Sequence, residues 1–215
     1  MRKHWFLALV FLAFFFASCD DGVERSYSDD GKLKSELRYA NDKLDGECIW
    51  YYSNGQKLIQ ANYKDGLKEG RFLRWHSNGE LEEDCWYKHD VLDSVYHSYS
   101  EKGKLVAEGY YSNGKRNGPF KKWYDNGQVF QDGQYVDDMM DGLWLVFYPE
   151  GQLAARAQYD MGRGKQVGYS EEGIVMIEVH FDDNVKHGKE IHYAPDGSVV
   201  EVVEYEHGKK VQEKE

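Results

Sequence analysis

The sequence predicts an all-β protein built as an antiparallel meander of about eight β-hairpin repeats, each 24 residues long. The first observation behind this prediction is a glycine that recurs every 24 residues, with one interval of 22. These anchor glycines are Gly31, Gly55, Gly79, Gly103, Gly127, Gly151, Gly173 and Gly197. The second observation is an aromatic residue eight positions after every anchor, at Tyr39, Tyr63, Tyr87, Tyr111, Tyr135, Tyr159, Phe181 and Tyr205. A fixed period of this length is typical of repeat architectures, which present an extended surface rather than one enclosed site.

The segment after each anchor glycine has the alternation of a half-buried strand. In the sixth copy, Leu153, Ala155, Ala157 and Tyr159 share one face and alternate with polar residues. A turn is expected next, as in residues 64–70, where glycine supplies backbone angles that other residues avoid. A second short strand then leads to the next Ser-Asn-Gly turn, which gives two strands per repeat and about sixteen in all.

A second glycine marks the turn within most copies, fifteen residues after the anchor. It is present at Gly46, Gly70, Gly118, Gly142 and Gly188. Ser94 takes its place in the third copy, and Gly164 takes it two residues early in the sixth. We therefore place the two-residue deletion of the sixth copy inside this turn, where an even-numbered loss keeps every side chain on its own face.

A further ring lies four residues before each anchor glycine, and together the aromatic residues predict a continuous spine. Each hairpin cannot bury its apolar face alone and must stack on its neighbours. An alternative is that part of the aromatic row lines a concave face and stacks a sugar or grips a peptide. The candidate binding residues are Trp75, Trp123, Trp144 and Phe147.

These motifs resemble the bacterial MORN-repeat variant family. The resemblance rests on the pattern Tyr-x-Asn-Gly-x-Leu, then Tyr, then Gly-x-Phe/Trp-x-x-Trp/Tyr, best seen from Tyr52 through Trp75 and from Tyr111 through Gly127. It covers residues 27–208 and implies an elongated, twisted antiparallel sheet of MORN-type hairpins with no catalytic residues. Some members of the family are labelled as antitoxins of toxin–antitoxin systems.

The N-terminus predicts a lipoprotein. Arg2 and Lys3 precede an apolar run that is too short for a conventional membrane span, and Ser18-Cys19 follows it. The segment from Phe16 to Cys19 resembles a bacterial lipobox, which makes Cys19 the expected site of lipidation. The expected organisation is a signal peptide (1–18), the lipidated cysteine with a short tether (19–26), the repeat domain (27–208) and a charged tail (209–215).

Charge and composition exclude several classes of ligand and site. Removing Arg2 and Lys3 with the signal takes the net charge from −11 to −13. Such a surface argues against nucleic acid and anionic lipid head groups as ligands, because both are bound by basic patches. Cys48 and Cys85 should lie about 14 Å apart across three strand steps, too far for a disulfide. No motif indicates a catalytic site or a cofactor, and His180, His187 and His192 fall in a strand, a turn and the next strand.

These observations predict a non-catalytic scaffold in the bacterial cell envelope. It would be held at the membrane by the lipid on Cys19, and its sheet would bind another envelope protein. Which membrane and which face it occupies stay open. Two alternatives remain: a glycan-binding surface protein that uses exposed aromatic rings, and an antitoxin-like neutraliser of a partner toxin that acts in the envelope.

Overall fold

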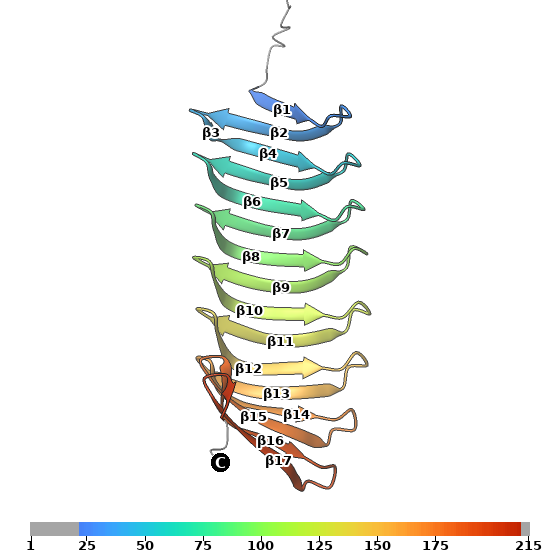
Figure 1. Ribbon diagram of the computed structural model, residues 1–215, viewed down its shortest axis with the longest axis vertical. Coiled ribbons are helices and arrows are strands. Elements are labelled where there is room, and N and C mark those ends of the chain that lie inside the picture. Colours follow the sequence, from blue (N-terminus) through green and yellow to red (C-terminus); the bar gives the residue numbers. More distant parts are fainter. Residues whose placement is uncertain (1–21, 212–215) are drawn as a thin grey trace, which may run out of the picture.

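The protein is a single antiparallel meander along the part of the chain that is described. The computed structural model describes residues 22–211 and contains strands and turns there, but no helix. Each strand pairs antiparallel with the next along the chain, except that β3 and β4 both pair with β2, and the strands lie one after another along the long axis (Figure 1). The strands are β1 (Val23–Tyr27), β2 (Leu33–Ala40), β3 (Lys43–Leu44), β4 (Gly46–Tyr51), β5 (Lys57–Lys64), β6 (Leu67–Trp75), β7 (Leu81–Lys88), β8 (Val91–Tyr99), β9 (Leu105–Ser112), β10 (Lys115–Trp123), β11 (Val129–Val136), β12 (Met139–Phe147), β13 (Leu153–Asp160), β14 (Arg163–Tyr169), β15 (Val175–Asp182), β16 (Val185–Tyr193), β17 (Val199–Glu206) and β18 (Lys209–Lys210).

The predicted fold class is confirmed, and the predicted sixteen strands are all present. Two differences raise the number to 18. The second strand of the first repeat is divided into β3 and β4 at Asp45, and β1 precedes the first repeat. Because β1 begins at Val23, the sheet includes residues 23–26, which the sequence analysis assigned to the tether. At the other end, β18 lies within the predicted tail.

The Ser-Asn-Gly turns join neighbouring repeats and also hold them together. In the turn at Gly55, the N–H of Gly55 donates to Tyr52 O at 2.9 Å, and the Asn54 side chain accepts from the N–H of Gln56 at 3.0 Å. Asn54 Nδ2 then donates to Ser77 O in the next turn at 2.7 Å. The same bond recurs from Asn78 and from Asn126 to the turns that follow them. The asparagine thus closes its own turn and ties it to the next repeat.

The turns on the opposite side of the sheet are shorter than the sequence analysis expected. Asp65 and Gly66 alone form the turn, both with positive φ (50° and 87°), which is the two-residue hairpin geometry that matches strand twist. Gly70 lies inside β6 with a φ of 92°, beside a register shift against β5. The second glycine therefore forms a β-bulge and not part of the turn, which corrects the prediction. Ser94 adopts the same left-handed conformation, with a φ of 87°.

The deletion in the sixth repeat removes this bulge and leaves the turn intact. Met161 and Gly162 form the two-residue turn with positive φ (48° and 81°). β14 has seven residues where β12 and β16 have nine, and it pairs with β13 without a register shift. The prediction that the deletion lies in the turn is therefore wrong. Its even length still preserves the alternation of faces.

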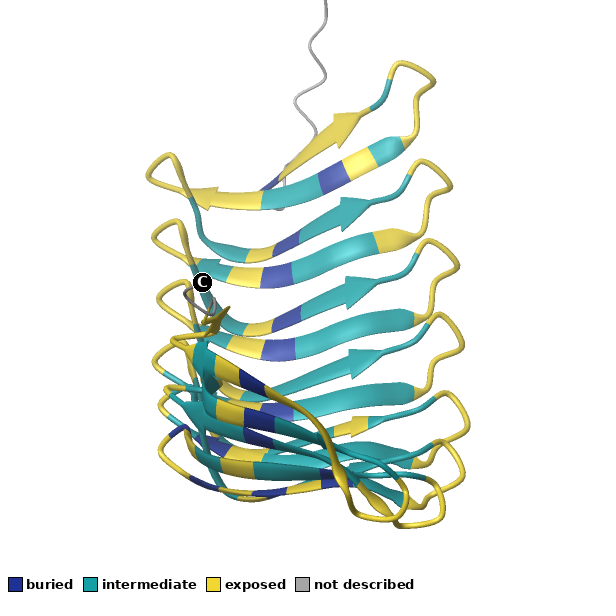
Figure 2. Cartoon of the chain, turned by 60° about the horizontal axis from the view of Figure 1, so that its bottom comes forward, coloured by how far each residue is buried: buried dark blue, intermediate teal, exposed yellow. Residues whose placement is uncertain are grey.

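The short sixth repeat brings the turns of the fifth and seventh repeats together. Asn184 Oδ1 accepts from the N–H of Met140 at 2.8 Å, and Asn184 Nδ2 donates to Asp138 O at 2.9 Å. In earlier repeats, the same position bonds to the adjacent copy, as when Asp90 Oδ1 accepts from the N–H of Lys68 at 2.7 Å. From β14 onward, the strands turn away from the direction of the earlier ones (Figures 1 and 2).

The core is one row of side chains that crosses the sheet from strand to strand. In the second to fifth repeats, an aromatic ring on the second strand alternates with a small residue on the first strand, so that each ring lies over an alanine, cysteine or glycine. We call this row the core row, and the face that carries it the core face; its buried members are among the dark segments in Figure 2. The core row consists of Cys48, Ala61, Phe72, Cys85, Tyr96, Gly109, Phe120, Gly133, Trp144, Ala157, Gln166, Val179, Glu190 and Val203.

The tyrosines that follow the anchors by eight residues flank the core row and pack on its rings. Tyr87 meets Phe72 edge to face with centroids 5.6 Å apart, and Tyr135 meets Phe120 in the same way at 5.4 Å. This confirms the predicted aromatic spine for these repeats. Cys48 and Cys85 are both buried and unpaired, as predicted, because Ala61 and Phe72 separate them in the row.

Candidate protein-interaction surface

Trp144 is a core residue and not an exposed binding residue as the sequence analysis proposed. Its side chain is 3% exposed and lies over Gly133 and Ala157. Its Nε1 donates to Gln134 O at 3.1 Å, and its ring meets Tyr135 edge to face with centroids 4.9 Å apart. A ring held on every side in this way has no free face to offer a ligand.

The other three predicted binding residues are half-buried near the Ser-Asn-Gly turns. Each is the last residue of the second strand of its repeat and lies next to a register shift: Trp75 in β6, Trp123 in β10 and Phe147 in β12. The Lys57 ammonium lies 5.5 Å from the centre of the Trp75 ring, so that ring already has a partner on one side. These three rings stay candidate binding residues, whereas Trp144 lies in the core row.

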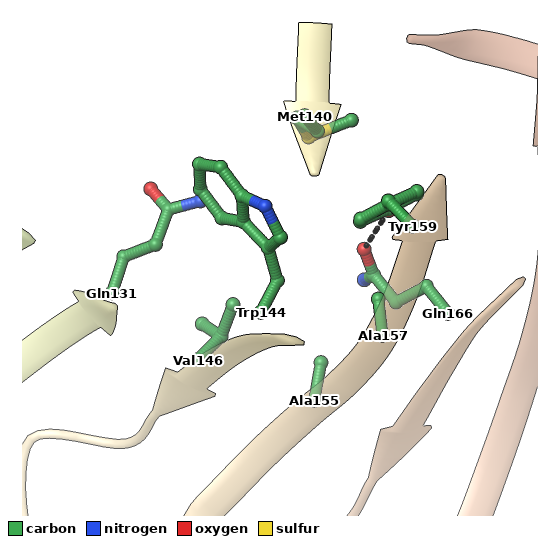
Figure 3. Close-up of a pocket in the computed structure, with 8 residues that line it drawn as sticks. All are labelled: Gln131, Met140, Trp144, Val146, Ala155, Ala157, Tyr159 and Gln166. Atoms are coloured by element: carbon green, nitrogen blue, oxygen red, sulfur yellow. Dashed lines mark hydrogen bonds between the residues drawn. The ribbon is translucent and has the colours of Figure 1, made fainter. Parts of the chain in front are cut away.

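A small pocket opens on the core face where the sixth repeat lacks its ring. Gln166 takes the place of the ring, and the Tyr159 hydroxyl contacts Gln166 Oε1 at 3.4 Å (Figure 3). Trp144, Ala155 and Ala157 line the same pocket. Its volume of about 30 Å³ has room for a water molecule or two and not for a sugar ring.

The opposite face carries a line of apolar side chains across the central repeats, all exposed except the half-buried Val95. We call it the central stripe, and it consists of Trp86, Val95, Tyr110, Pro119 and Leu143. Trp86, Tyr110 and Leu143 are 45%, 39% and 44% exposed. Each lies next in the chain to a core-row residue and therefore points to the other face. The stripe runs from β7 to β12, about 24 Å at 4.8 Å per strand step.

Pairing between strands makes the central stripe continuous over its first four residues. Val95 is the direct partner of Tyr110. Trp86 lies opposite the bulge that contains Ser94, and Tyr110 lies opposite the bulge that contains Gly118. Gln134 stands between Pro119 and Leu143 and donates through Nε2 to Asp141 Oδ2 at 3.1 Å.

The same repeat positions are polar outside the central repeats. On the N-terminal side they hold Glu47, Asn62 and Arg71, and on the C-terminal side Gln158, Lys165, His180, Lys189 and Glu204. The sheet continues without interruption through all of these positions. Exposed apolar side chains at these positions are therefore not a structural requirement of the repeat, and their restriction to three copies at these positions marks a specialised surface.

Paired charges border the central stripe on the same face. Arg71 forms a two-pronged bond to Asp84 at 2.9 and 2.8 Å, and this hydrogen bonding raises the pKa of Arg71. His97 contacts Glu108 at 3.1 Å, and Lys121 contacts Asp132 at 2.9 Å. An apolar centre with a polar rim is the usual composition of a protein interface.

A charged cluster replaces the aromatic ring in the seventh repeat. Glu190 lies buried in the core row, where its carboxylate is bonded by Lys186 Nζ and by His192 Nε2, the latter at 2.9 Å. Burial alone would raise the pKa of Glu190, but the hydrogen bonds from Lys186 and His192 outweigh it and lower the pKa. Both oxygens of the Glu190 carboxylate are therefore hydrogen-bonded, which allows a charged side chain to occupy this core-row position.

The described residues contain no arrangement that suggests a metal centre. Between residues 22 and 211, no group of three or more His, Cys, Asp or Glu side chains is placed to hold a metal ion. His187 instead stacks edge to face on His207, with ring centroids 5.1 Å apart. The predicted lipidation site, Cys19, lies outside the described residues. Residues 22–211 also contain no helical segment that could serve as a membrane span.

Comparison with protein families identifies the repeat. The sequence pattern of the MORN repeat variant family matches five segments, which together make up half of the chain: residues 20–41, 44–65, 116–137, 140–161 and 186–207. The chain belongs to the MORN repeat variant family. MORN repeats are generally protein- or membrane-binding modules. The five matches leave out residues 66–115, the segment that contains Trp86, Val95 and Tyr110.

The other comparisons add no functional argument about this MORN-repeat protein. The search of curated proteins gave no match. Among solved structures, "Crystal Structure of TcdB2-TccC3" is 11% identical over 84% of this chain, with a TM-score of 0.18. The match spans 14% of that chain.

The sequence analysis missed the central stripe, although the MORN repeat itself contained a signal for it. Aligning the copies at their anchor glycines places Trp86 and Tyr110 seven residues after an anchor, where the neighbouring copies have Asn62 and Gln134. Trp75, Trp123 and Phe147 belong to a set of rings that recurs in every copy, and Trp144 belongs to the core row. Deviation from the repeat was the better indicator.

Proposed function

We propose that the protein is a non-catalytic scaffold of the bacterial cell envelope, anchored by a lipid on Cys19, whose MORN-repeat sheet binds another protein through the central stripe. The central stripe is the observation that carries this proposal. It offers Trp86 and Tyr110, the residue types most often responsible for binding energy at protein interfaces, on a rigid surface with a polar rim.

Two features favour a protein partner over a small ligand or a membrane surface. The pocket between Trp144 and Gln166 is too small for a sugar ring, and in the hollow of about 420 Å³ beside Trp75 the Lys57 side chain already lies over that ring, whereas the central stripe is open and about 24 Å long. The chain carries a net charge of −11, and an acidic surface is repelled by anionic lipid head groups. Attachment to the membrane is assigned to Cys19 because lipid anchoring does not depend on this charge.

Substitution in the central stripe tests the binding surface. Trp86→Lys should weaken partner binding about 30-fold or more, which corresponds to the loss of one interface hot spot of about 2 kcal/mol. Asn62→Lys is the matched control, because it also introduces a lysine, at the same position of the preceding repeat, without removing an apolar ring. Purification of each variant from the native envelope, followed by quantification of the co-purified proteins, measures the effect.

The outcomes separate the competing functions. Equal recovery of the partner by both variants would contradict the role of the central stripe. Recovery of polysaccharide alone would support glycan binding, and recovery of a toxin would support the antitoxin-like role. Lipid anchoring is tested independently by Cys19→Ala, which should release the protein from membranes; continued membrane association would refute it.

A further inference from the structure

The central stripe is long and narrow. It runs from β7 to β12, about 24 Å, and over most of this length it is one side chain wide. Asp84 and Glu108 stand two residues along the strand from Trp86 and Tyr110, at a distance of about 7 Å. A partner β-sheet packed on this face would cover the neighbouring row and bury those carboxylates, which is costly. The shape of the stripe instead suits a partner that contacts it along a single line.

The spacing of the central stripe distinguishes a helix from an extended segment. The stripe crosses the strands, so its side chains follow one another at about 4.8 Å per strand step. An amphipathic helix presents an apolar side chain at every turn, about 5.4 Å apart, whereas an extended segment presents one about every 6.8 Å. A helix therefore stays nearly in step with the stripe, and an extended segment does not. A helix as long as the stripe has about 16 residues.

The border of the central stripe is acidic. Carboxylates outnumber lysine and arginine side chains along its two sides: the carboxylates are Asp84, Asp93, Glu108, Asp132 and Asp141, and the basic side chains are Arg71, Lys88 and Lys121. The chain as a whole carries a net charge of −11. A basic partner is attracted to such a surface, whereas a second copy of this chain brings the same acidic border and is repelled.

We propose that the partner binds through a basic amphipathic helix of about 16 residues, which lies along the central stripe and crosses the strands. This inference rests on the proposed function and adds the chemistry of the partner. The apolar side chains of the helix would pack on Trp86, Tyr110 and Leu143. Lysine or arginine beside them on the helix would face Glu108 and Asp132, so the helix covers the apolar line and leaves these carboxylates at its border.

Peptide binding to the full chain tests the proposal. The probe is a fluorescently labelled peptide of about 16 helix-forming residues, with leucine at every turn on one face and lysine beside the leucines. Fluorescence anisotropy should give a dissociation constant of about 10 μM. A peptide of the same composition in scrambled order, and one with glutamate in place of lysine, should each bind about tenfold more weakly or worse. The NMR chemical shifts of the bound, isotope-labelled probe should be those of a helix.

Matched variants of the protein place the helix on the central stripe. Trp86→Lys should weaken binding of the lysine peptide about 30-fold or more, and Asn62→Lys should bind it normally. Glu108→Gln removes one carboxylate from the border and should weaken binding about threefold. Its control is Glu178→Gln, which makes the same change at the same position of the seventh repeat and should bind normally. The lysine peptide should also displace the native partner in the purification from the envelope.

The outcomes distinguish failure of the helix from failure of the proposed function. If recovery of the native partner requires Trp86 but the lysine peptide neither binds nor displaces that partner, the helix is refuted and the central stripe keeps its role. If recovery does not depend on Trp86, the proposed function fails and this inference fails with it. Equal binding of the scrambled peptide, or a bound probe that is not helical, also overturns the proposal. A dimer that Trp86→Lys dissociates, or peptide binding only by a chain that lacks residues 1–21, would assign the stripe to another occupant and refute it.

Discussion

Gly133 and Gly109 occupy the same position of the core row in successive repeats, yet substitution by alanine should affect them differently. A β-carbon on Gly133 would lie 2.3 Å from Cδ2 and 2.5 Å from Cε2 of the Trp144 indole, which is itself fixed by its bond to Gln134 O. A β-carbon on Gly109 would lie 3.3 Å from Cδ2 of Phe120, so that ring needs to move by only a few tenths of an ångström. Neither glycine has a positive φ, so the backbone accepts alanine at both positions.

The magnitude follows from two opposing effects. Overpacking a core costs about 1–3 kcal/mol, and displacing the indole also threatens a hydrogen bond worth about 1 kcal/mol. Replacing glycine by alanine stabilises by about 0.4–1 kcal/mol, because the unfolded chain loses conformational freedom. We therefore expect Gly133→Ala to destabilise the protein by about 2 kcal/mol, and Gly109→Ala to change its stability by less than about 1 kcal/mol.

Thermal unfolding followed by circular dichroism measures both variants. At about 2–4 °C per kcal/mol for a chain of this size, Gly133→Ala should lower the melting temperature by about 4–8 °C. The double variant Gly133→Ala with Trp144→Phe should recover part of the loss, because the smaller ring makes room for the methyl group. Equal losses for the two alanine variants would refute the alternation of large and small residues as the basis of the core row.

The remaining predictions concern the bulge, the turn contact and two buried groups. Ser94→Gly should stabilise the protein by about 0.5–1 kcal/mol in urea unfolding, because relief of a left-handed conformation that costs a non-glycine residue about 1–2 kcal/mol outweighs the conformational freedom, worth about 0.4–1 kcal/mol, that glycine gives the unfolded chain; unchanged or reduced stability would contradict this strain. Asn184→Gly keeps the left-handed backbone but removes the side-chain bonds to Asp138 and Met140, so it should destabilise by about 2 kcal/mol in the same assay. A loss below about 0.5 kcal/mol, the lower limit for a single hydrogen bond, would show that the protein does not need this contact. The folded pKa of Glu190 is lowered, so its stabilising contribution is present above the unfolded value of about 4.5 and is lost as pH falls through the folded pKa. The difference in urea midpoint between wild type and Glu190→Gln should therefore shrink from pH 7 to pH 3, and a constant difference would argue against the ion cluster. Burial raises the pKa of the Cys85 thiol to about 12, so it should react with a thiol reagent at pH 8 only after unfolding; rapid reaction of the folded protein would contradict its burial.

The sequence was sufficient for the fold because the same local rules are repeated many times. The anchor glycines, the tyrosines that follow them and the alternation between them each recur in nearly every copy, so one misread residue does not alter the fold. The position of the turn was harder to predict. Residues 64–70 contain two glycines, and only the pairing between β5 and β6 shows that Gly66 turns the chain while Gly70 forms a bulge.

The candidate site was not predictable in the same way. Trp144 and Trp86 are both tryptophans on strands of similar repeats, and composition does not separate them. Their difference comes from the register: Trp144 lies in the core row over Gly133, whereas Trp86 follows the core-row residue Cys85 and points to the other face. Which of the two faces holds the core is decided by packing over many strands, and a single repeat does not contain that information.

The contrast between the two faces also explains why the central stripe requires a function outside the fold. On the core face, the equivalent positions carry rings or small side chains that neighbouring strands bury, and a polar substitution there costs folding energy. On the opposite face, Asn62 and Gln158 occupy the position of Trp86 and Tyr110 without interrupting the sheet. Trp86 keeps 45% of its surface in water in the folded state, so it contributes less to stability than a buried ring does. The exposed part of its apolar surface is removed from water only when another molecule covers it. Lysine at Trp86 should therefore leave the melting temperature nearly unchanged while it weakens partner binding, a combination that no substitution in the core row can produce.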